Sequence, residues 1–217
     1  MTPRLLAIAG LVRPGAAVVD VGSDHGYVPI YLLKTGIAKR ALATDVNEGP
    51  LERSRENIAR FGFGDAIGTQ KANGMQDVDI TSYDTVIIAG MGGMLIAEIL
   101  QNAPELDGKK LILQPMTATA ELRQYLTENG FFILCEHMVQ EGEKLYVILE
   151  AEKGEVEPYS RAELLVGRTS KSDPLYPLLL KKTTEKLQKR LNGLQKGKTP
   201  EKDEIERIKA LLEELES

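Results

Sequence analysis

The sequence of 217 residues contains one cysteine, two histidines and no tryptophan, and these scarcities exclude several kinds of protein. The single cysteine, Cys135, cannot form an intrachain disulfide, and its apolar neighbours predict a buried thiol. The histidines, His25 and His137, are far apart in the sequence, and neither a CxxC nor an HxxxH pair is present. We therefore predict no metal site.

Long apolar runs are absent as well. No segment approaches the roughly 18–20 consecutive apolar residues that a membrane-spanning helix requires, and residues 1–15 lack the architecture of a signal peptide. With 42% hydrophobic and 27% charged residues, the chain can bury a core and remain in solution. We therefore expect a cytoplasmic protein without membrane attachment.

The net charge of −5 hides an asymmetry along the chain. Residues 1–158 carry 14 Lys+Arg and 22 Asp+Glu, whereas residues 161–198 carry 10 against 3, and residues 199–217 carry 3 against 7. A basic segment between acidic ones is a candidate phosphate-contacting surface, although a solvated helical face has the same pattern.

Strands alternate with helices over the first 130 residues. Apolar runs predict strands at residues 17–21, 40–45, 67–72, 83–90 and 110–115, and helices at residues 25–34, 50–60, 93–101 and 117–129. A short helix from Thr2-Pro3 to about Leu11 precedes them. This alternation predicts an α/β fold with a parallel, doubly wound sheet.

The end of the sheet differs from its beginning. Residues 131–140 and 144–152 both have the composition of strands, and only Glu141-Gly142-Glu143 separates them. Three residues are too few for a parallel crossover, which needs a dozen or more, but they suffice for a hairpin. A seven-stranded sheet with its last strand reversed is the arrangement of class I S-adenosylmethionine methyltransferases, whereas the NAD-type Rossmann sheet is all parallel.

The C-terminal segment is predicted to be helical. Apolar residues recur at helical spacing on both sides of a break at residues 196–198, after which Thr199-Pro200 restarts a helix: Leu178, Leu187, Leu191, Leu194, Ile205, Ile208, Leu212 and Leu215. Two such helices predict an antiparallel, coiled-coil-like hairpin. We therefore divide the chain into a Rossmann-like domain at residues 1–158 and a helical domain at residues 159–217.

Ligand-facing residues of an open α/β sheet lie at the carboxyl ends of its strands. This rule selects the ends of the first four predicted strands: Asp20, Gly22, Ser23, Asp24 and His25; then Asp45 and Val46; then Asn73 and Gly74; then Gly90 and Met91. Asp45 can accept hydrogen bonds from two ribose hydroxyls, which NAD and S-adenosylmethionine both offer.

The turn after the first strand distinguishes between these two ligands. Its spacing, Gly22-x-x-x-Gly26, is not the GxGxxG of a dinucleotide fold. Asp20 and Asp24 would repel a pyrophosphate but attract the ammonium and sulfonium groups of S-adenosylmethionine, and Gly22 permits close approach of the backbone. Either acid could instead cap the following helix.

Two further features have competing interpretations. His25 could act as a base, stack on a nucleobase or pack at the start of a helix. A tight turn explains Gly92 and Gly93, whereas Gly90 beside Met91 is better explained by a flat substrate that needs backbone clearance.

Four segments together carry a resemblance to a known family: DVGSDHGYVP, ALATDVNEGPL, IIAGMGGMLI and LILQP, in this order. They resemble the TrmK family of bacterial tRNA (adenine-N1)-methyltransferases, which modify position 22 of tRNA. The resemblance implies S-adenosylmethionine as donor, tRNA as acceptor, and a helical domain that contacts tRNA. It gives Asp24 the catalytic role and Asp45 the ribose, and it implies that Gly22, Gly90 and Met91 line the cofactor. The remaining strand-end residues named above are expected to bind the cofactor because of their position.

Two positions depart from the family pattern. Met116 replaces an asparagine after Gln-Pro, and Ala72-Asn73-Gly74 replaces Gly-Asp-Gly. Asn73 can still accept a hydrogen bond from the adenine amine, whereas Met116 offers no useful donor or acceptor. The residues alone leave other readings open: another RNA, a protein or a small molecule as acceptor, a NAD-dependent oxidoreductase, or a non-catalytic binding module, as a monomer or a dimer.

Overall fold

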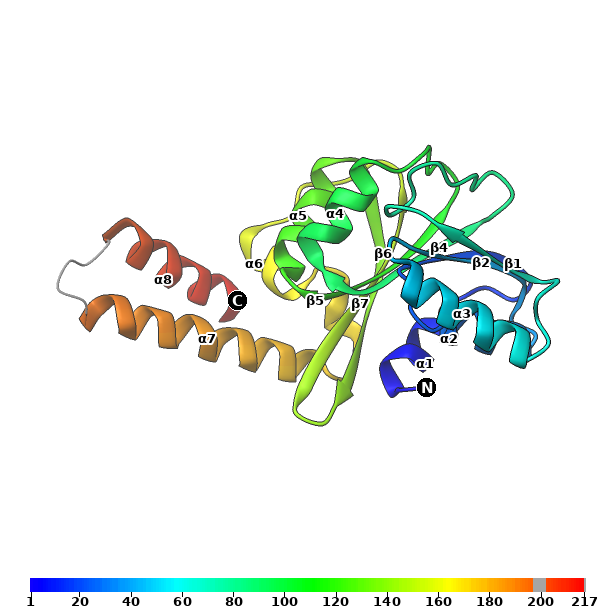
Figure 1. The fold of residues 1–217 in the computed structure, drawn as a ribbon. Coiled ribbons are helices and arrows are strands. Elements are labelled where there is room, and N and C mark those ends of the chain that lie inside the picture. Colours follow the sequence, from blue (N-terminus) through cyan, green and yellow to red (C-terminus); the bar gives the residue numbers. More distant parts are fainter. Residues whose placement is uncertain (197–201, 217) are drawn as a thin grey trace.

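The computed structural model describes residues 1–196 and 202–216. Its centre is one seven-stranded sheet in the order β3-β2-β1-β4-β5-β7-β6 (Figure 1). The strands are β1 (Ala16–Val21), β2 (Ala38–Asp45), β3 (Ile67–Lys71), β4 (Thr85–Gly92), β5 (Lys110–Thr117), β6 (Phe131–Glu141) and β7 (Lys144–Lys153). The helices are α1 (Pro3–Gly10), α2 (Tyr27–Lys34), α3 (Glu48–Arg60), α4 (Gly93–Gln101), α5 (Thr119–Glu128), α6 (Arg161–Val166), α7 (Tyr176–Lys196) and α8 (Lys202–Glu216), with a 3₁₀ turn η1 (Thr169–Ser172).

The first five strands are parallel, and β7 runs antiparallel to both β5 and β6. The hairpin closes with Glu141 opposite Lys144, as the three-residue spacing predicted. The predicted fold class, a Rossmann-like methyltransferase sheet with its last strand reversed, is confirmed. Most boundaries lie within two or three residues of the predicted ones.

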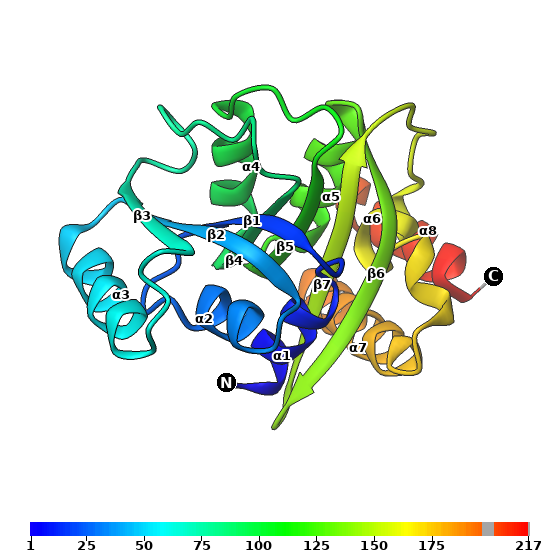
Figure 2. The ribbon, with the colours of Figure 1, turned by 90° about the vertical axis from the view of Figure 1, so that its right-hand side faces the viewer.

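Helices cover both faces of the sheet (Figure 2). α1, α2 and α3 pack on one face against alternate strand residues such as Val18 and Ile87, and α4 and α5 pack on the other against Val19 and Ile88. Parallel strands buried on both faces need continuous apolar sequence, which β1 and β4 have. The polar exception in β1 is Asp20, and its position near the strand end agrees with its selection as a candidate site residue.

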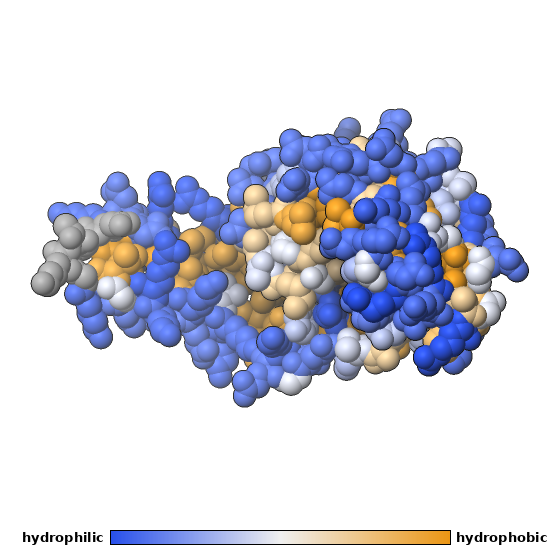
Figure 3. Space-filling view, in the orientation of Figure 1, coloured by the Kyte–Doolittle hydropathy of each residue, from blue (hydrophilic) through white to orange (hydrophobic). Residues whose placement is uncertain are grey.

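The C-terminal helices form an arm that extends from the sheet domain (Figure 1). α7 and α8 are paired through a seam of Leu191, Ile208 and Leu212, with an ion pair of 2.7 Å from Arg190 to Glu204. The predicted antiparallel hairpin is therefore present, while the predicted cap at Thr199-Pro200 lies outside the described residues. Figure 3 shows hydrophilic side chains over the arm, with apolar ones between its helices.

Residues 159–175 pack on the sheet domain, and α6 also contacts both helices of the arm. Arg123 of α5 is fully buried and bonds to Glu136 of β6 at 2.6 Å, and its guanidinium also donates to the carbonyl oxygens of Leu164 and Leu165 at 2.8 and 3.1 Å. Ser170 of η1 donates to the same Glu136 at 2.8 Å. The boundary at residue 158 stays a prediction, because α6 and η1 are held by the core of the first domain.

No helix in the described part of the chain is both long and apolar enough to cross a membrane. The prediction of a buried thiol is wrong, because Cys135 is only partly buried. The cause is its position on β6, an edge strand that has a neighbour on one side alone.

Candidate active site

The carboxyl ends of β1, β2, β4 and β5 meet at one edge of the sheet. Val21 pairs with Thr44 and with Ile88, and Ala89 pairs with Gln114. The strand ends that the sequence selected are therefore neighbours in space. Two polar residues that precede the turns, Asp20 and Gln114, are buried there.

The turn after β1 is fixed to β2. The backbone N–H groups of Gly22 and Ser23 both donate to the carbonyl oxygen of Thr44 at 2.9 Å, next to Asp45. Gly22 has a φ of +71°, and a Cβ at this position would collide with the methyl group of Met91. The left-handed backbone thus favours glycine at this position, whereas the contact with the flexible end of the Met91 side chain can be relieved by a small movement.

Asp20 is a desolvated carboxylate. It is 5% exposed, and Ser23 Oγ donates to its Oδ2 at 2.6 Å. Burial raises the pKa of Asp20 to about 6, and the hydrogen bond from Ser23 opposes this shift only in part. No ion pair with Asp20 is present among the described residues. A buried acid of this kind fits a cationic ligand group, which would replace the lost hydration.

Asp24 lies in the same turn with a φ of +51°, a left-handed conformation that is uncommon for a residue with a Cβ. Its Oδ1 lies 3.3 Å from Arg53 of α3, and its backbone carbonyl accepts a hydrogen bond of 2.6 Å from Ser54. The carboxylate is 57% exposed at the mouth of the turn. Such strain is typical of functional sites.

Neither acid caps the helix that follows. The N-cap of α2 is Gly26, and no side chain donates or accepts a capping bond there. The capping interpretation of Asp20 and Asp24 is therefore wrong. It also follows that the two carboxylates are held by Ser23 and Arg53 rather than by the helix N-terminus.

His25 packs beside the start of α2, as one of its three interpretations predicted, while its roles as a base and as a stacking surface for a nucleobase stay predictions. Its ring stacks on Tyr27 with centroids 5.1 Å apart and planes 18° apart, and its backbone carbonyl accepts from Asn57 at 3.0 Å. Nε2 lies 3.5 Å from Asp24 Oδ2. The stacked pair presents a partly exposed aromatic surface beside Asp24, since Tyr27 is 49% exposed.

The ends of β2 and β3 carry the next two groups. Asp45 Oδ1 accepts a hydrogen bond of 2.9 Å from the Asn47 N–H, and Val46 between them is exposed. Asn73 is placed beside them because the N–H of Ala72 donates to the Asp45 carbonyl at 3.0 Å. Gly74 has a different explanation: its φ is +63°, and a Cβ there would press on the side chain of an isoleucine of α4.

Three glycines of the β4 turn have distinct reasons. Gly93 is needed because a Cβ would collide with the carbonyl of Ala118 in the next loop, and Gly92 approaches Thr117. Gly90 has a φ of +80° at a shift of register between β4 and β5. This backbone conformation alone requires glycine. The prediction that Gly90 is a glycine because a flat substrate needs backbone clearance is therefore not needed to explain it.

The sequence did not single out Arg4 and Arg53 as site residues. Arg53 lies in a helix of ordinary charged composition, and its contact with Asp24 depends on how α3 packs. Arg4 lies 110 residues before Gln114 but donates to its Oε1 at 2.5 Å. No local sequence signal marks either contact, because both depend on the tertiary arrangement.

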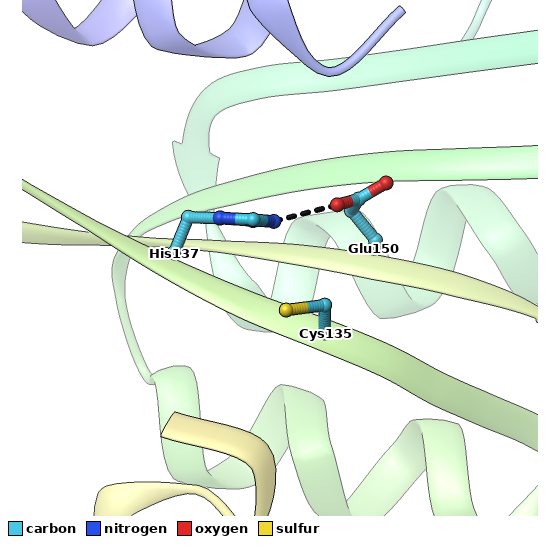
Figure 4. Close-up of side chains that lie close together, drawn as sticks. All are labelled: Cys135, His137 and Glu150. Atoms are coloured by element: carbon cyan, nitrogen blue, oxygen red, sulfur yellow. Dashed lines mark hydrogen bonds and ion pairs between the residues drawn. The ribbon is translucent and has the colours of Figure 1, made fainter. Parts of the chain in front are cut away.

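A separate cluster joins Cys135, His137 and Glu150, whose potential ligand atoms all lie within 4.8 Å of one another (Figure 4). The prediction from sequence missed it because Glu150 faces Cys135 only through the pairing of β6 with β7. His137 Nε2 lies 2.6 Å from Glu150 Oε1, and Lys110 is paired with the other oxygen. Lys110 thus already supplies the cation that balances Glu150.

Comparison with known proteins places the chain in a family. A model of the methyltransferase domain matches residues 1–149. The tRNA (adenine(22)-N(1))-methyltransferase of Bacillus subtilis is 32% identical over 157 residues, which cover 71% of this chain and 66% of that relative.

Solved structures match the whole chain. A putative tRNA (m1A22) methyltransferase of Streptococcus pneumoniae, in complex with S-adenosylmethionine, is 34% identical with a TM-score of 0.80, and the match covers 98% of this chain and 99% of that one. TrmK of M. capricolum, in complex with S-adenosylhomocysteine, is 26% identical with a TM-score of 0.83 over 100% and 96%. With a methyltransferase fold and domain, and likeness along its full length to these structures, the chain belongs to the TrmK family of methyltransferases.

Proposed function

We propose that this protein transfers a methyl group from S-adenosylmethionine to N1 of adenine 22 in tRNA. The observation that carries the proposal is the pair of acids in the first turn, buried Asp20 and exposed Asp24, where a phosphate-binding fold would present bare amides. Relatives of this chain carry the name of this reaction. A tRNA substrate also places the enzyme in the cytoplasm, and this location is part of the proposal.

The strand-end residues fit the donor. Asp20 provides a buried negative charge for its cationic groups, Gly22 lets the backbone approach it, and Asp45 is available to the ribose hydroxyls. The other residues that we propose to contact the adenosine of the donor are Asn73, Val46 and the neighbours of Gly90. When bound, S-adenosylmethionine supplies an electrophilic methyl group on a sulfonium.

Asp24 acts on the acceptor base. Neutral adenine already holds a lone pair on N1, so no proton must leave before attack, and the enzyme supplies chiefly alignment and electrostatics. The base becomes cationic as the N–C bond forms and the S–C bond of the donor breaks, with the electron pair of that bond returning to sulfur. A carboxylate fixed nearby stabilises that charge, and Asp24 can accept a hydrogen bond from the exocyclic amine and later its proton. Arg53 holds Asp24 in place at 3.3 Å.

The acceptor must be unpaired, because N1 lies on the pairing edge of adenine. His25 and Tyr27 offer a stacked aromatic surface at the mouth of the turn for such an extruded base. Met116, 41% exposed at the end of β5, contributes an apolar edge instead of the polar clamp that an asparagine would give.

A cleft joins the sheet edge to α7, the basic helix of the arm. It encloses about 780 Å³, and its walls include Met116, Tyr146 and the basic residues Lys144, Lys182, Lys186 and Arg190. Basic side chains bind the tRNA backbone without reading its sequence. This continuity from the β5 end to α7 favours a nucleic acid over a small molecule as acceptor.

Mass spectrometry of nucleosides from tRNA incubated with the protein and donor tests the reaction. We expect 1-methyladenosine from a transcript with adenine at position 22 and none from the same transcript with guanine there. Asp24→Asn should bind S-adenosylhomocysteine normally but transfer methyl slowly. Wild-type rates from Asp24→Asn would remove Asp24 from the mechanism, and no 1-methyladenosine from the wild type would refute the function.

The cleft is tested separately. Lys182→Ala with Lys186→Ala should weaken tRNA binding and lower its dependence on salt concentration by about one counterion per lysine. Lys209→Ala, an exposed lysine of α8 outside the cleft, is the matched control. Equal salt dependence in the two variants would exclude the cleft as the tRNA path.

A further inference from the structure

Arg4, in the first turn of α1, connects three elements far apart in the sequence. Its guanidinium Nη1 donates to Gln114 Oε1 at the end of β5, over 2.5 Å. The guanidinium carbon also lies 5.3 Å from the ring centroid of Tyr146 on β7, and the Arg4 backbone N–H donates to Glu141 Oε1 at 2.6 Å. α1 is therefore fastened at once to the sheet edge and to the β6–β7 hairpin.

Gln114 passes this contact on to β4. It is fully buried, and its Oε1 also accepts a hydrogen bond of 3.1 Å from the Gly90 N–H. Its Nε2 donates to the carbonyl of Pro115 at 2.8 Å. Because Arg4 has only donors, it requires the oxygen of this amide to face it, and the same oxygen is then the acceptor for Gly90. Arg4, the Gly90 N–H and the Pro115 carbonyl thus all favour the same amide orientation.

Gly90 is the point at which β4 leaves the regular sheet. It has a φ of +80°, and the register between β4 and β5 shifts at this residue. The next residue, Met91, lies against Gly22 in the turn after β1. A Cβ at Gly90 would lie 3.7 Å from Arg4 Nη1, so the cation is directly beside this bend. A change in the Gln114 amide would therefore move the strand end that borders both proposed ligands.

Stability alone does not explain Arg4. Its Nε is buried and has no hydrogen-bond partner among the described residues, which is an unfavourable state for a charged donor. An aliphatic side chain of the same length would avoid this cost and still pack on Tyr146. The feature that an aliphatic residue cannot supply is the charged donor on Gln114.

We propose that Arg4 is a positioning residue for methyl transfer, acting through Gln114 on Gly90. It sets the conformation of the β4 end and thereby the alignment of base and donor. The proposal rests on the proposed function for its kinetic consequence but not for the coupling of the three residues.

Arg4→Met tests the kinetic part, since it keeps the side-chain stem and removes the donors. We expect its single-turnover methylation rate to fall by about 10- to 100-fold, while the dissociation constants of S-adenosylhomocysteine and tRNA stay within about 2-fold of wild type. Arg4→Lys, which retains a cationic donor, should recover part of the rate. Arg13→Met is the matched control, because Arg13 pairs with Glu152 on the surface.

Hydrogen exchange at the Gly90 amide tests the coupling without any substrate. We expect faster exchange at this amide in Arg4→Met and wild-type exchange in Arg13→Met. If Arg4→Met does not fold, Arg4→Leu replaces it in both measurements, since leucine also lacks a donor for Gln114.

Three results would overturn the proposal: an unchanged methylation rate, unchanged exchange at Gly90, or a loss confined to tRNA affinity, which would make Arg4 a phosphate contact. A wild-type protein inactive on tRNA would refute the proposed function instead. The exchange measurement would then still decide whether Arg4 fixes Gly90.

Discussion

Replacing Asp20 by asparagine should stabilise the protein and weaken its binding of the donor. Asp20 is 5% exposed, and burial raises the pKa of its carboxyl from 3.8 to about 6. A shift of about two units, at 1.36 kcal/mol per unit, corresponds to about 3 kcal/mol of destabilisation wherever the carboxyl is ionised in both states. Asparagine removes the charge and keeps an oxygen for the Ser23 hydroxyl.

The sign of this effect depends on pH in a defined way. Between pH 3.8 and about 6, folded Asp20 keeps a proton that the unfolded chain has released, so wild-type stability falls as the pH rises through this window. Above about pH 6 Asp20 is ionised in both the folded and the unfolded state, and the destabilisation is constant. Below pH 3.8 it is protonated in both states, and the destabilisation disappears. The advantage of Asp20→Asn should therefore be about 3 kcal/mol at pH 7.5 and under about 1 kcal/mol at pH 4.

Urea unfolding at pH 4, 5, 6 and 7.5 measures this profile, with Asp65→Asn as control because Asp65 is an exposed aspartate outside the site. Calorimetry at pH 7.5 measures the affinity of each variant for S-adenosylmethionine. We expect a clear loss of affinity in Asp20→Asn and none in Asp65→Asn. A stability gain that is absent, or equal at all four pH values, would refute the assignment of Asp20 as a desolvated carboxylate. Unchanged affinity would refute its role toward the cationic donor.

Three other substitutions probe the fold around the site. Arg123→Met leaves Glu136 buried without its partner and should cost about 3–5 kcal/mol in urea unfolding; a loss under about 1 kcal/mol would contradict a buried pair. Gly93→Ala places a Cβ against the Ala118 carbonyl and should cost about 1–3 kcal/mol, whereas Gly64→Ala, with open space around it, should cost much less, and equal losses would contradict the packing argument. Burial alone would raise the pKa of Glu150, but hydrogen bonds from Lys110 and His137 outweigh burial and lower it. The stability from this depressed pKa is present above pH 4.5 and is lost as the pH falls through the folded pKa, so Glu150→Gln should flatten acid unfolding measured by circular dichroism, and an unchanged acid limb would contradict it.

The sequence predicted the sheet well because its signals are local. A buried parallel strand such as Thr85–Gly92 needs a continuous apolar run, and the three residues between the last two predicted strands permit only a hairpin, which the structure closes with two residues between β6 and β7. The strand-end rule then brought Asp20, Asp24 and Asp45 to one edge without any knowledge of side-chain contacts.

Side-chain environments were less accessible to prediction. The thiol of Cys135 lies in an apolar run, but apolar sequence does not reveal that β6 is an edge strand. Gly90, Gly92 and Gly93 look alike in sequence, yet a left-handed φ fixes the first and the Ala118 carbonyl excludes a side chain at the third. Such reasons depend on the neighbouring loop, which no periodicity specifies.

The two arginines at the site show where local reasoning ends and what the fold adds. Arg53 restrains the exposed carboxylate of Asp24, and Arg4 fixes the amide of buried Gln114. Neither touches the other, and they come from helices on the same face of the sheet. α1 and α3 therefore each contribute one cation to an edge of the sheet that otherwise carries the negative charges of the strand-end carboxylates. Methyl transfer creates positive charge on the base, so the Arg53 cation, which is paired with Asp24, holds the geometry without opposing that charge as strongly as a free cation would.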